Sequence, residues 1–380
     1  MQESRGYSIP LFDLNYDHEE EEAVLATLRS RWISTGPRTV EFERLFAEAL
    51  GARHAVAVAN CTCALHLALQ IVGIREADEV IVPSLTFVAT ANAVRYVRAT
   101  PVFCDIRGPD DLNIDPEQIE SLITEKTRAI LVMHYGGFPC DMDRILELAR
   151  KHRLRVVEDA CHGPLSEYRG RKLGTMGDIG CFSFFSNKNI STGEGGMLVT
   201  GDAEFAERAR LLRSHGMTTL SYQRASGHST RYDVIESGYN YRMDDIHAAL
   251  GIVQLGKLRD DIGRRALVRD NYLEALADAH GIMVPFGRHE DMVSNYIFPV
   301  VLERADAARR DAVRDTMHNR GIQTSIHYPA VHRFSGFEPY RRTLPKTERV
   351  SDSLVTLPMH GRLSADDVSR VAATLRELTR

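Results

Sequence analysis

Lys188 has sequence surroundings that are unusual for a lysine side chain. It lies in the segment FSFFSNKNISTGEGG, between a run of aromatic residues and a glycine-rich stretch. Most lysines are solvated surface charges, and that is the simpler interpretation of this one. A lysine beside an apolar strand is poorly placed for free solvation, and an amine held there can have its pKa lowered and form a Schiff base with a carbonyl compound. Lys188 is therefore the first candidate catalytic residue.

Asp159 is a second group of a useful chemical type. It ends the segment RVVED, which predicts a short buried strand, and it precedes Lys188 by 188 − 159 = 29 positions. Open α/β sheets bind ligands outside the carboxyl ends of their strands, although a carboxylate there can also be only a helix cap. Pyridoxal 5'-phosphate (PLP) chemistry needs a lysine for the Schiff base and a carboxylate that keeps the pyridine nitrogen protonated. Lys188 and Asp159 are the residue types for these two roles.

A PLP site also needs an anchor for the phosphate. The segment 60–63 (NCTC) joins a predicted strand to a predicted helix, so backbone N–H groups and the Thr62 hydroxyl would form an anion site there. Ser183 could add a second hydroxyl, and Phe87, which follows another predicted strand, could stack on a planar ring. Each feature also has an ordinary explanation, namely a helix cap, a strand serine and a core aromatic residue.

Motifs for other kinds of chemistry are not matched. The segment 193–196 (GEGG) lacks the spacing and the GK[ST] end of a nucleotide-triphosphate loop, and no GxGxxG follows a predicted strand. Cys61 and Cys63 are one residue apart without a second pair, and His327 and His332 have a spacing that cannot place both on one helical face. We therefore expect no metal site.

The elements that would position these residues alternate along the chain. From about residue 54, short apolar segments alternate with segments of helical spacing, which is typical of right-handed βαβ units in a largely parallel sheet. The dense charge run 18–22 predicts the first turn of an earlier helix. The expected strands are 54–59, 79–82, 100–105, 129–134 and 155–160, and the expected helices are 62–72, 87–97, 116–122 and 142–152.

The pattern changes after residue 180. Two adjacent strands joined by a glycine-rich loop predict a hairpin at the far side of the sheet, and a second unit begins near residue 256. We therefore divide the chain into a large domain, 1–256, and a small C-terminal domain, 257–380. The polar segment 218–237 is expected to be a long surface loop that closes over the substrate. The expected elements are strands at 181–185, 197–200 and 297–301 and helices at 203–214, 244–273, 305–320 and 365–380.

The composition excludes several classes of protein. The chain has 380 residues, 43% hydrophobic and 26% charged, which is ordinary for a soluble globular protein. Its net charge of 47 − 52 = −5 disfavours nucleic acid as a partner, because proteins that follow phosphate backbones carry a basic surplus. No apolar run approaches the length of a membrane span and no signal-peptide pattern opens the chain, so we expect no membrane partner. Six cysteines, mostly in apolar segments, favour reduced thiols and a cytoplasmic protein.

Several segments, in order and spacing, resemble the DegT/DnrJ/EryC1/StrS family of PLP-dependent sugar aminotransferases, which has the aspartate aminotransferase fold type I. The most specific are VPSLTFVATANAV, VVEDACH, FSFFSNKN followed by STGEGGM, and GYNYRMDDIHAALG. The matching segments run from Trp32 to Pro329, which is nearly the whole chain. The resemblance implies an α/β fold, with a large domain built on a mostly parallel mixed sheet flanked by helices and a smaller α+β C-terminal domain.

The resemblance also implies roles for single residues. Lys188 matches the Schiff-base lysine that shuttles the proton between cofactor and substrate carbons, and Asp159 matches the partner of the pyridinium nitrogen. His162 takes the position of a Gln or His near the PLP hydroxyl, and Phe87 that of the ring-stacking aromatic. Asn240 resembles a residue that reaches the phosphate of the neighbouring subunit, which implies a homodimer with shared active sites. Phosphate contacts are implied for Thr62, Cys63 (through its backbone) and Ser183, and substrate contacts for Ser34, Thr35, Gly36, Arg242 and His327.

The implied reaction moves an amino group through PLP. The donor in the family is commonly L-glutamate, and we expect the acceptor to be the keto group of a nucleotide-linked sugar, an NDP-4-keto-6-deoxyhexose, in amino-sugar biosynthesis. The segment 61–63 (CTC) replaces the usual Gly-Thr-Ala and Asn187 is a variant before the lysine, so a slightly reshaped phosphate turn is expected. A dehydratase branch has histidine in place of the lysine, and Lys188 argues against it. A PLP-dependent sugar dehydratase, an inosose aminotransferase and a non-catalytic sugar-nucleotide-binding protein stay open as alternatives.

Overall fold

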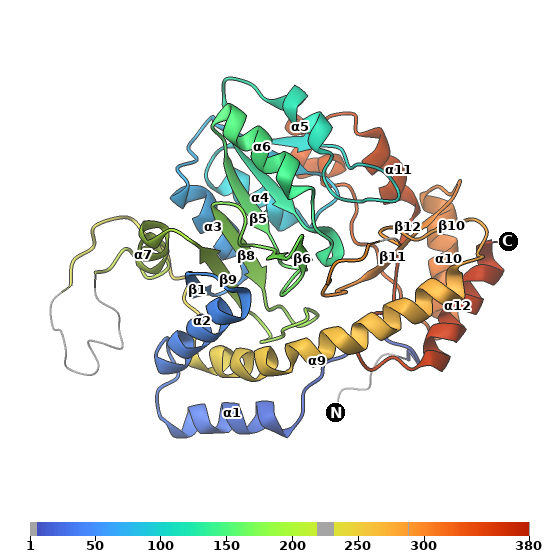
Figure 1. Cartoon of the computed structure of the whole chain (residues 1–380), viewed down its shortest axis with the longest axis horizontal. Helices are drawn as coiled ribbons and strands as arrows, with labels where there is room; N and C mark the ends of the chain where they lie inside the picture. Colours follow the sequence, from blue (N-terminus) through green and yellow to red (C-terminus); the bar gives the residue numbers. More distant parts are fainter. Residues whose placement is uncertain (1–5, 219–231, 288, 380) are drawn as a thin grey trace.

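The centre of the protein is a seven-stranded sheet with the strand order β1-β9-β8-β5-β4-β2-β3 (Figure 1). The computed structural model describes residues 6–218, 232–287 and 289–379. Neighbouring strands are parallel except for β9, which runs antiparallel to both β1 and β8. The predicted α/β fold with a mostly parallel mixed sheet is therefore confirmed. The strands are β1 (His54–Val58), β2 (Glu79–Pro83), β3 (Thr100–Cys104), β4 (Thr127–Met133), β5 (Arg155–Asp159), β8 (Ile179–Ser183) and β9 (Gly196–Thr200).

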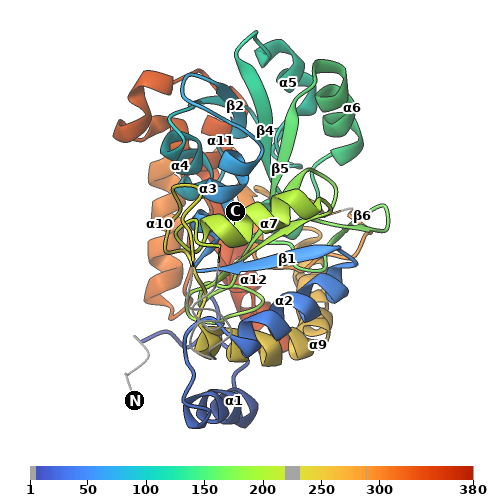
Figure 2. The same cartoon turned by 90° about the vertical axis from the view of Figure 1, so that its left-hand side faces the viewer.

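Helices cover both faces of this sheet. On one face, apolar residues of α2, α5, α6 and α9 join a single core with alternate residues of the strands. On the other face, α3, α4 and α7 form a second core with the remaining strand residues. Figure 2 shows β1 between α2 on one side and α7 on the other. The helices are α2 (Pro37–Leu50), α3 (Cys61–Ile71), α4 (Val88–Tyr96), α5 (Pro116–Leu122), α6 (Met142–His152), α7 (Ala203–Leu212) and α9 (Asp245–Leu276).

The predicted hairpin is present, but it lies one strand inside the edge of the sheet rather than at the edge. β8 and β9 pair antiparallel over Gly180–Ser183 and Gly196–Val199, as expected. The edge position belongs to β1, which pairs with the outer side of β9. β8 ends at Ser183, two residues before the predicted end of the strand, because the chain turns there toward Lys188.

A smaller sheet follows in the last third of the chain. It is antiparallel, with the order β10 (Ile282–Met283), β11 (Phe298–Leu302) and β12 (Leu354–Leu357). Its core includes residues of α10 (Ala307–Asn319), α12 (Ala365–Thr379) and the second half of α9. β12 was not predicted, since a strand of four residues is too short to show a period. The remaining elements are α1 (His18–Arg29), α11 (Pro345–Ser353) and a ribbon of β6 (Glu167–Tyr168) and β7 (Arg171–Lys172).

The helix α9 connects the two sheets. It runs unbroken through residue 256 and contacts α1 and α2 with one part and α12 with another (Figure 1). Ile9, near the start of the chain, packs into the core of the smaller sheet, and its N–H donates to the carbonyl of Gly321 at 3.0 Å. The division at 256/257 therefore stays a prediction. Most of the predicted 218–237 loop (219–231) lies outside the described residues.

A buried ion pair joins α2 to the segment after α7. The guanidinium of Arg213 contacts both the Glu43 carboxylate and the carbonyl of Ala57, and the Ala57 N–H donates to Glu43 at 2.9 Å. Replacing Arg213 with Met would leave the Glu43 carboxylate buried and unpaired, so we expect the free energy of unfolding to fall by about 3–5 kcal/mol. Chemical denaturation monitored by circular dichroism measures this. Arg44→Met, which breaks the exposed Arg44–Glu48 pair of the same helix, is the control and should cost under about 1 kcal/mol. Equal losses in both variants would contradict the prediction.

None of the described helices is long and apolar enough to cross a membrane.

Candidate active site

Four strands of the large sheet deliver the predicted site residues to one edge. β1, β2, β5 and β8 point the same way, since β1 and β8 are each antiparallel to β9. Their carboxyl ends therefore meet, which is where open α/β sheets bind ligands. A cavity of about 390 Å³ lies at this edge. The predicted site residues that line it are Thr62, Phe87, Asp159, Ser183, Lys188 and His327.

The Asp159 carboxylate is fixed at the floor of the cavity. It ends β5, is almost fully buried, and accepts a hydrogen bond from the Thr90 hydroxyl at 2.8 Å and from the Cys161 N–H at 3.2 Å. The Thr90 oxygen lies 2.7 Å from the Thr86 hydroxyl. These two donors hold the carboxylate in one orientation. Asp159 thus lines the cavity with a carboxyl group of fixed orientation.

The Lys188 amine lies over an aromatic ring. Its Nζ is 4.1 Å from the centre of the Tyr296 ring. Burial acts to lower the pKa of Lys188, but the facing Tyr296, Cys161 and Asp159 outweigh burial, and the pKa is raised above its ordinary value. The expected lowering of this pKa is therefore wrong in direction, because the sequence did not show which groups face the amine. Lys188 is a cation when nothing is bound to it.

The start of α3 forms the opposite end of the cavity. Asn60 caps this helix, and its side chain accepts the Cys63 N–H at 2.9 Å. The cap thus occupies the backbone donor that the resemblance assigned to phosphate, and Cys63 does not line the cavity. The first backbone N–H groups of the helix and the Thr62 hydroxyl remain suited to an anion. Gly196 passes so close that a Cβ there would lie 2.4 Å from the Asn60 carbonyl carbon, which explains a glycine at this point.

Phe87 is exposed rather than part of a core. It is the N-cap residue of α4 and 55% of its surface is accessible, although it borders the cavity. Its ring centre lies 6.0 Å from that of Tyr328. An exposed aromatic side chain at a cavity wall has a free face for a planar ligand. This argues against the simpler interpretation as a core residue.

His162 lies behind the cavity and does not line it. Its Nδ1 accepts the Gly136 N–H at 3.2 Å, so the proton of the neutral ring is on Nε2, which lies 2.8 Å from the Tyr328 hydroxyl. Its ring stacks on Tyr296 at 4.4 Å. Burial first, and then the charge of Lys188, hold the pKa of His162 well below its ordinary value. The structure thus places His162 as a neutral support for two tyrosines of the site.

His327 is also neutral. Burial, followed by the charge of Lys188, lowers its pKa to about 3. Its Nδ1 lies 3.1 Å from the Thr356 hydroxyl, and its ring borders the cavity. A neutral imidazole in this place can exchange hydrogen bonds with a polar substrate without carrying charge.

These two histidines predict a loss of stability in acid. Unfolded histidine binds a proton near its ordinary pKa of about 6.5, whereas the folded protein keeps both rings neutral well below that pH. The unfolded state therefore binds more protons, and the free energy of unfolding should fall by up to about 1.4 kcal/mol per pH unit for each histidine as the pH drops below about 6.5. Urea denaturation at several pH values measures the slope. His327→Gln should flatten it, and His18→Gln, which changes an exposed side chain, is the control. An unchanged slope in His327→Gln would contradict the prediction.

Five of the predicted residues lie away from this cavity. Ser34, Thr35 and Gly36 precede α2, where the Gly36 N–H donates to Asp245 at 2.8 Å. Asn240 is exposed and pairs with Ser214 in an isolated bridge, and an Arg242 Nη lies 3.3 Å from the Ser214 hydroxyl. Within one chain, these residues do not join Lys188.

The structure adds residues that sequence reasoning missed. Tyr296 and Tyr328 line the cavity, and Thr90 orients Asp159. Tyr328 could have been noticed beside His327. Tyr296 precedes β11 of the smaller sheet, and no local pattern marks it, since the fold brings it to Lys188 from 108 positions away (296 − 188).

Together these groups fit PLP. The cavity offers an amine for an aldehyde, a carboxylate for a ring nitrogen, an exposed aromatic face for the ring and a helix start with hydroxyls for the phosphate. No group of three or more His, Cys, Asp or Glu side chains within the described ranges is placed to hold a metal ion.

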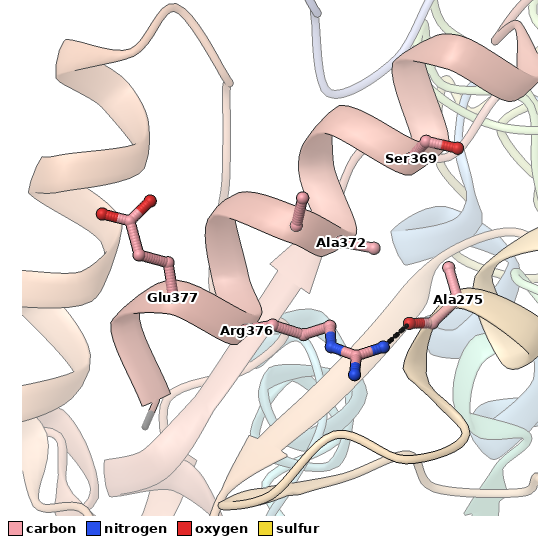
Figure 3. A pocket seen from close by; sticks show the side chains of 6 residues that line it. Ala275, Ser369, Ala372, Arg376 and Glu377 are labelled. Carbon is pink, nitrogen blue, oxygen red and sulfur yellow. Dashed lines mark hydrogen bonds between the residues drawn. The ribbon is translucent and has the colours of Figure 1, made fainter.

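A second hollow, of about 440 Å³, lies between α12 and the end of α9 (Figure 3). Ala275, Ala372 and Ala373 form part of its wall, and Arg376 donates to the Ala275 carbonyl at 2.9 Å. Glu377 pairs with Arg320. Ser369 also lines this hollow, but none of the predicted site residues does, so the candidate active site is the cavity at Lys188.

Comparison with known proteins identifies the family of the chain. Residues 15–376 match the model of the DegT/DnrJ/EryC1/StrS aminotransferase family. The spore coat polysaccharide biosynthesis protein SpsC of Bacillus subtilis is 39% identical over 98% of this chain and 97% of its own. The PLP form of Spr1654, described as a putative sugar aminotransferase of Streptococcus pneumoniae, superposes with a TM-score of 0.92 at 29% identity, over 98% of this chain and 99% of its own. DesI, solved in the presence of its TDP-sugar product, superposes with a TM-score of 0.88 at 32% identity, over 99% of this chain and 93% of its own.

Proposed function

Because the chain belongs to the DegT/DnrJ/EryC1/StrS aminotransferase family, we propose that it transfers an amino group from L-glutamate to the keto group of an NDP-4-keto-6-deoxyhexose. That it is a PLP-dependent sugar aminotransferase follows from the family and from its solved neighbours. The observation that carries the proposal is the meeting of Lys188 and Asp159 in one cavity, opposite the start of α3. The TDP-sugar product of DesI supports a nucleotide-linked acceptor.

We assign a separate role in the reaction to each residue of the cavity. When bound, PLP supplies an electron sink for charge that develops on the substrate carbon. Asp159 keeps a ring nitrogen protonated, and its own geometry is fixed by Thr90. Lys188, whose amine sits over Tyr296, takes and returns the proton at the reacting carbon. The start of α3 and Thr62 would hold the phosphate, and Phe87 would offer its ring to the cofactor ring.

A spectroscopic experiment tests this proposal. The PLP-loaded protein is mixed with L-glutamate, and the visible band of the bound cofactor should give way to that of its amine form. Adding an NDP-4-keto-6-deoxyhexose should then restore the first band and yield an amino sugar detectable by mass spectrometry. A band that is indifferent to every amino donor would overturn the aminotransferase. Bleaching without a product would overturn the acceptor alone, and an inosose or a 3-keto sugar would be tried next.

We also propose a homodimer in which each active site draws on both subunits, acting in the cytoplasm. Asn240 and the turn 34–36 lie away from their own chain's cavity, which leaves them available to a partner's. All six cysteines are free thiols, the state that the cytoplasm maintains.

Mixing two inactive variants tests the shared site. Lys188→Ala and Asn240→Ala each damage a different half of every site. After refolding together, half of the dimers should be mixed and each should hold one intact site, so about a quarter of wild-type activity is expected. Gel filtration with light scattering gives the mass of the mixed species. If the mixture is no more active than the two variants measured separately, the site is not shared at Asn240.

A further inference from the structure

The Tyr296 side chain is more closely fixed than its place in a core requires. It is 4% exposed and belongs to the apolar cluster that joins the ends of β2 and β4 to the smaller sheet. Its hydroxyl donates to the Asn187 side chain at 3.1 Å. Its ring stacks on His162 at 4.4 Å, with 24° between the ring planes. Three contacts of different kinds thus hold one ring beside the Lys188 amine.

His162 is well suited to support this ring. Its two ring nitrogens are occupied by the Gly136 N–H and the Tyr328 hydroxyl, so its orientation is fixed. It also stays neutral, as the lowered pKa indicates. A charged imidazole stacked on Tyr296 would repel the nearby ammonium, whereas a neutral one does not.

We infer that Tyr296 is a positioning residue, whose ring face holds the Lys188 amine within reach of the reacting carbon whenever the lysine is not bound to the cofactor. The amine lies 4.1 Å from the ring centre, well within the range of a cation–π contact. A ring face attracts the cation as a whole, whichever way its N–H bonds point. The amine is thereby held in place but keeps its protons available for transfer. This inference rests on the proposed role of Lys188 as the residue that carries PLP.

The direction of the Lys188 pKa agrees with this arrangement. Burial alone would lower it, and the electrostatic influence of Tyr296 is the largest of those that oppose burial. Removing the whole Tyr296 side chain, with its ring face over the amine, should therefore shift the titration of Lys188 to lower pH. A tyrosine that served only to fill the core would leave this titration unchanged.

Titration of Lys188 in the PLP-free protein tests the inference. The chain has six lysines, so reductive ¹³C-methylation gives a small set of NMR signals, and Lys188→Arg identifies that of Lys188. We expect the Lys188 signal to titrate at lower pH in Tyr296→Leu than in the wild type. Tyr296→Phe, which keeps the ring and loses the hydroxyl, should lie between them. The control is Tyr272→Leu, which removes another buried tyrosine, stacked on Phe298 near the smaller sheet, and should leave the Lys188 signal in place.

The rate of the glutamate half-reaction in the Tyr296 variants tests the inference independently of the titration. The glutamate half-reaction should slow by about 100-fold in Tyr296→Leu, since a misplaced catalytic group costs that much, and by at most about tenfold in Tyr296→Phe. Equal titration of Lys188 in the wild type and both variants would overturn the inference. If Tyr296→Leu does not fold, Tyr296→Phe decides: a half-reaction slowed by about 100-fold in this variant would show that the hydroxyl and not the ring face positions Lys188, and would overturn the inference. Failure of the proposed function would be visible separately, because the NMR titration needs neither donor nor acceptor.

Discussion

Replacing Lys188 with alanine is expected to abolish amino transfer, lowering the rate constant of the glutamate half-reaction by about 10⁴-fold or more. With the proposed roles of Lys188, the variant would lose both the amine for the cofactor aldehyde and the group that moves the proton. Lys188→Arg keeps the positive charge over Tyr296 but cannot serve as a nucleophile, so it should be equally inactive. Stopped-flow absorbance measures the half-reaction.

Two further measurements separate chemistry from structure in this experiment. Borohydride reduction followed by mass spectrometry should find the cofactor fixed to the wild-type chain and absent from both Lys188 variants. Methylamine added to Lys188→Ala should restore part of the rate, because a free amine can enter the emptied space and move the proton. Lys151→Ala, a change of an exposed lysine, is the matched control and should react like the wild type. A Lys188→Ala protein that keeps within about tenfold of the wild-type rate would contradict the assignment of Lys188.

The second large effect is expected for Asp159→Asn. The amide has nearly the same shape as the carboxylate but cannot carry its charge, so with the proposed role of Asp159 a protonated ring nitrogen would lose its partner. We expect kcat to fall by about 10²–10³-fold, the usual effect of removing one oriented electrostatic group. Because Thr90 and the Cys161 N–H both donate to Asp159, Asn would also turn an NH₂ toward one of them, and some loss of stability is expected.

Asp105→Asn is a matched control for this variant. Asp105 is also a buried carboxylate that follows a parallel strand, but it accepts from the Thr347 N–H at 2.7 Å and the Lys346 N–H at 3.1 Å, away from the cavity. It should lose about 1–3 kcal/mol of stability while kcat stays unchanged. If Asp159→Asn behaved like Asp105→Asn, Asp159 would be only a structural acceptor.

The sequence predicted much of this fold because its strands are short, apolar and separated by helices of clear period. The segments 54–59, 79–82 and 155–160 coincide with β1, β2 and β5 to within one residue at each end. Since strands joined by such helices are parallel, their carboxyl ends could be expected at one edge. The meeting of Asp159, Phe87 and Thr62 then followed from chain order alone.

Local sequence was less informative where tertiary contacts decide the outcome. β12 is too short for a period, and the edge position of β1 depends on how β9 pairs on both of its sides. The backbone donor expected from Cys63 is engaged by the Asn60 cap, a competition that residue types do not reveal. His162 faces two tyrosines from distant segments rather than the cavity.

The sequence by itself determined the residue types, their order and the sheet edge at which they gather, because these depend on periodicity and on the direction of parallel strands. Only the tertiary structure decided the protonation of the site. The pKa of Lys188 is raised by Tyr296, which comes from 108 positions further along the chain (296 − 188), and that of His327 is lowered by burial and by Lys188. Electrostatic interactions act through space, so the charge of a buried group depends on neighbours that the linear order does not identify.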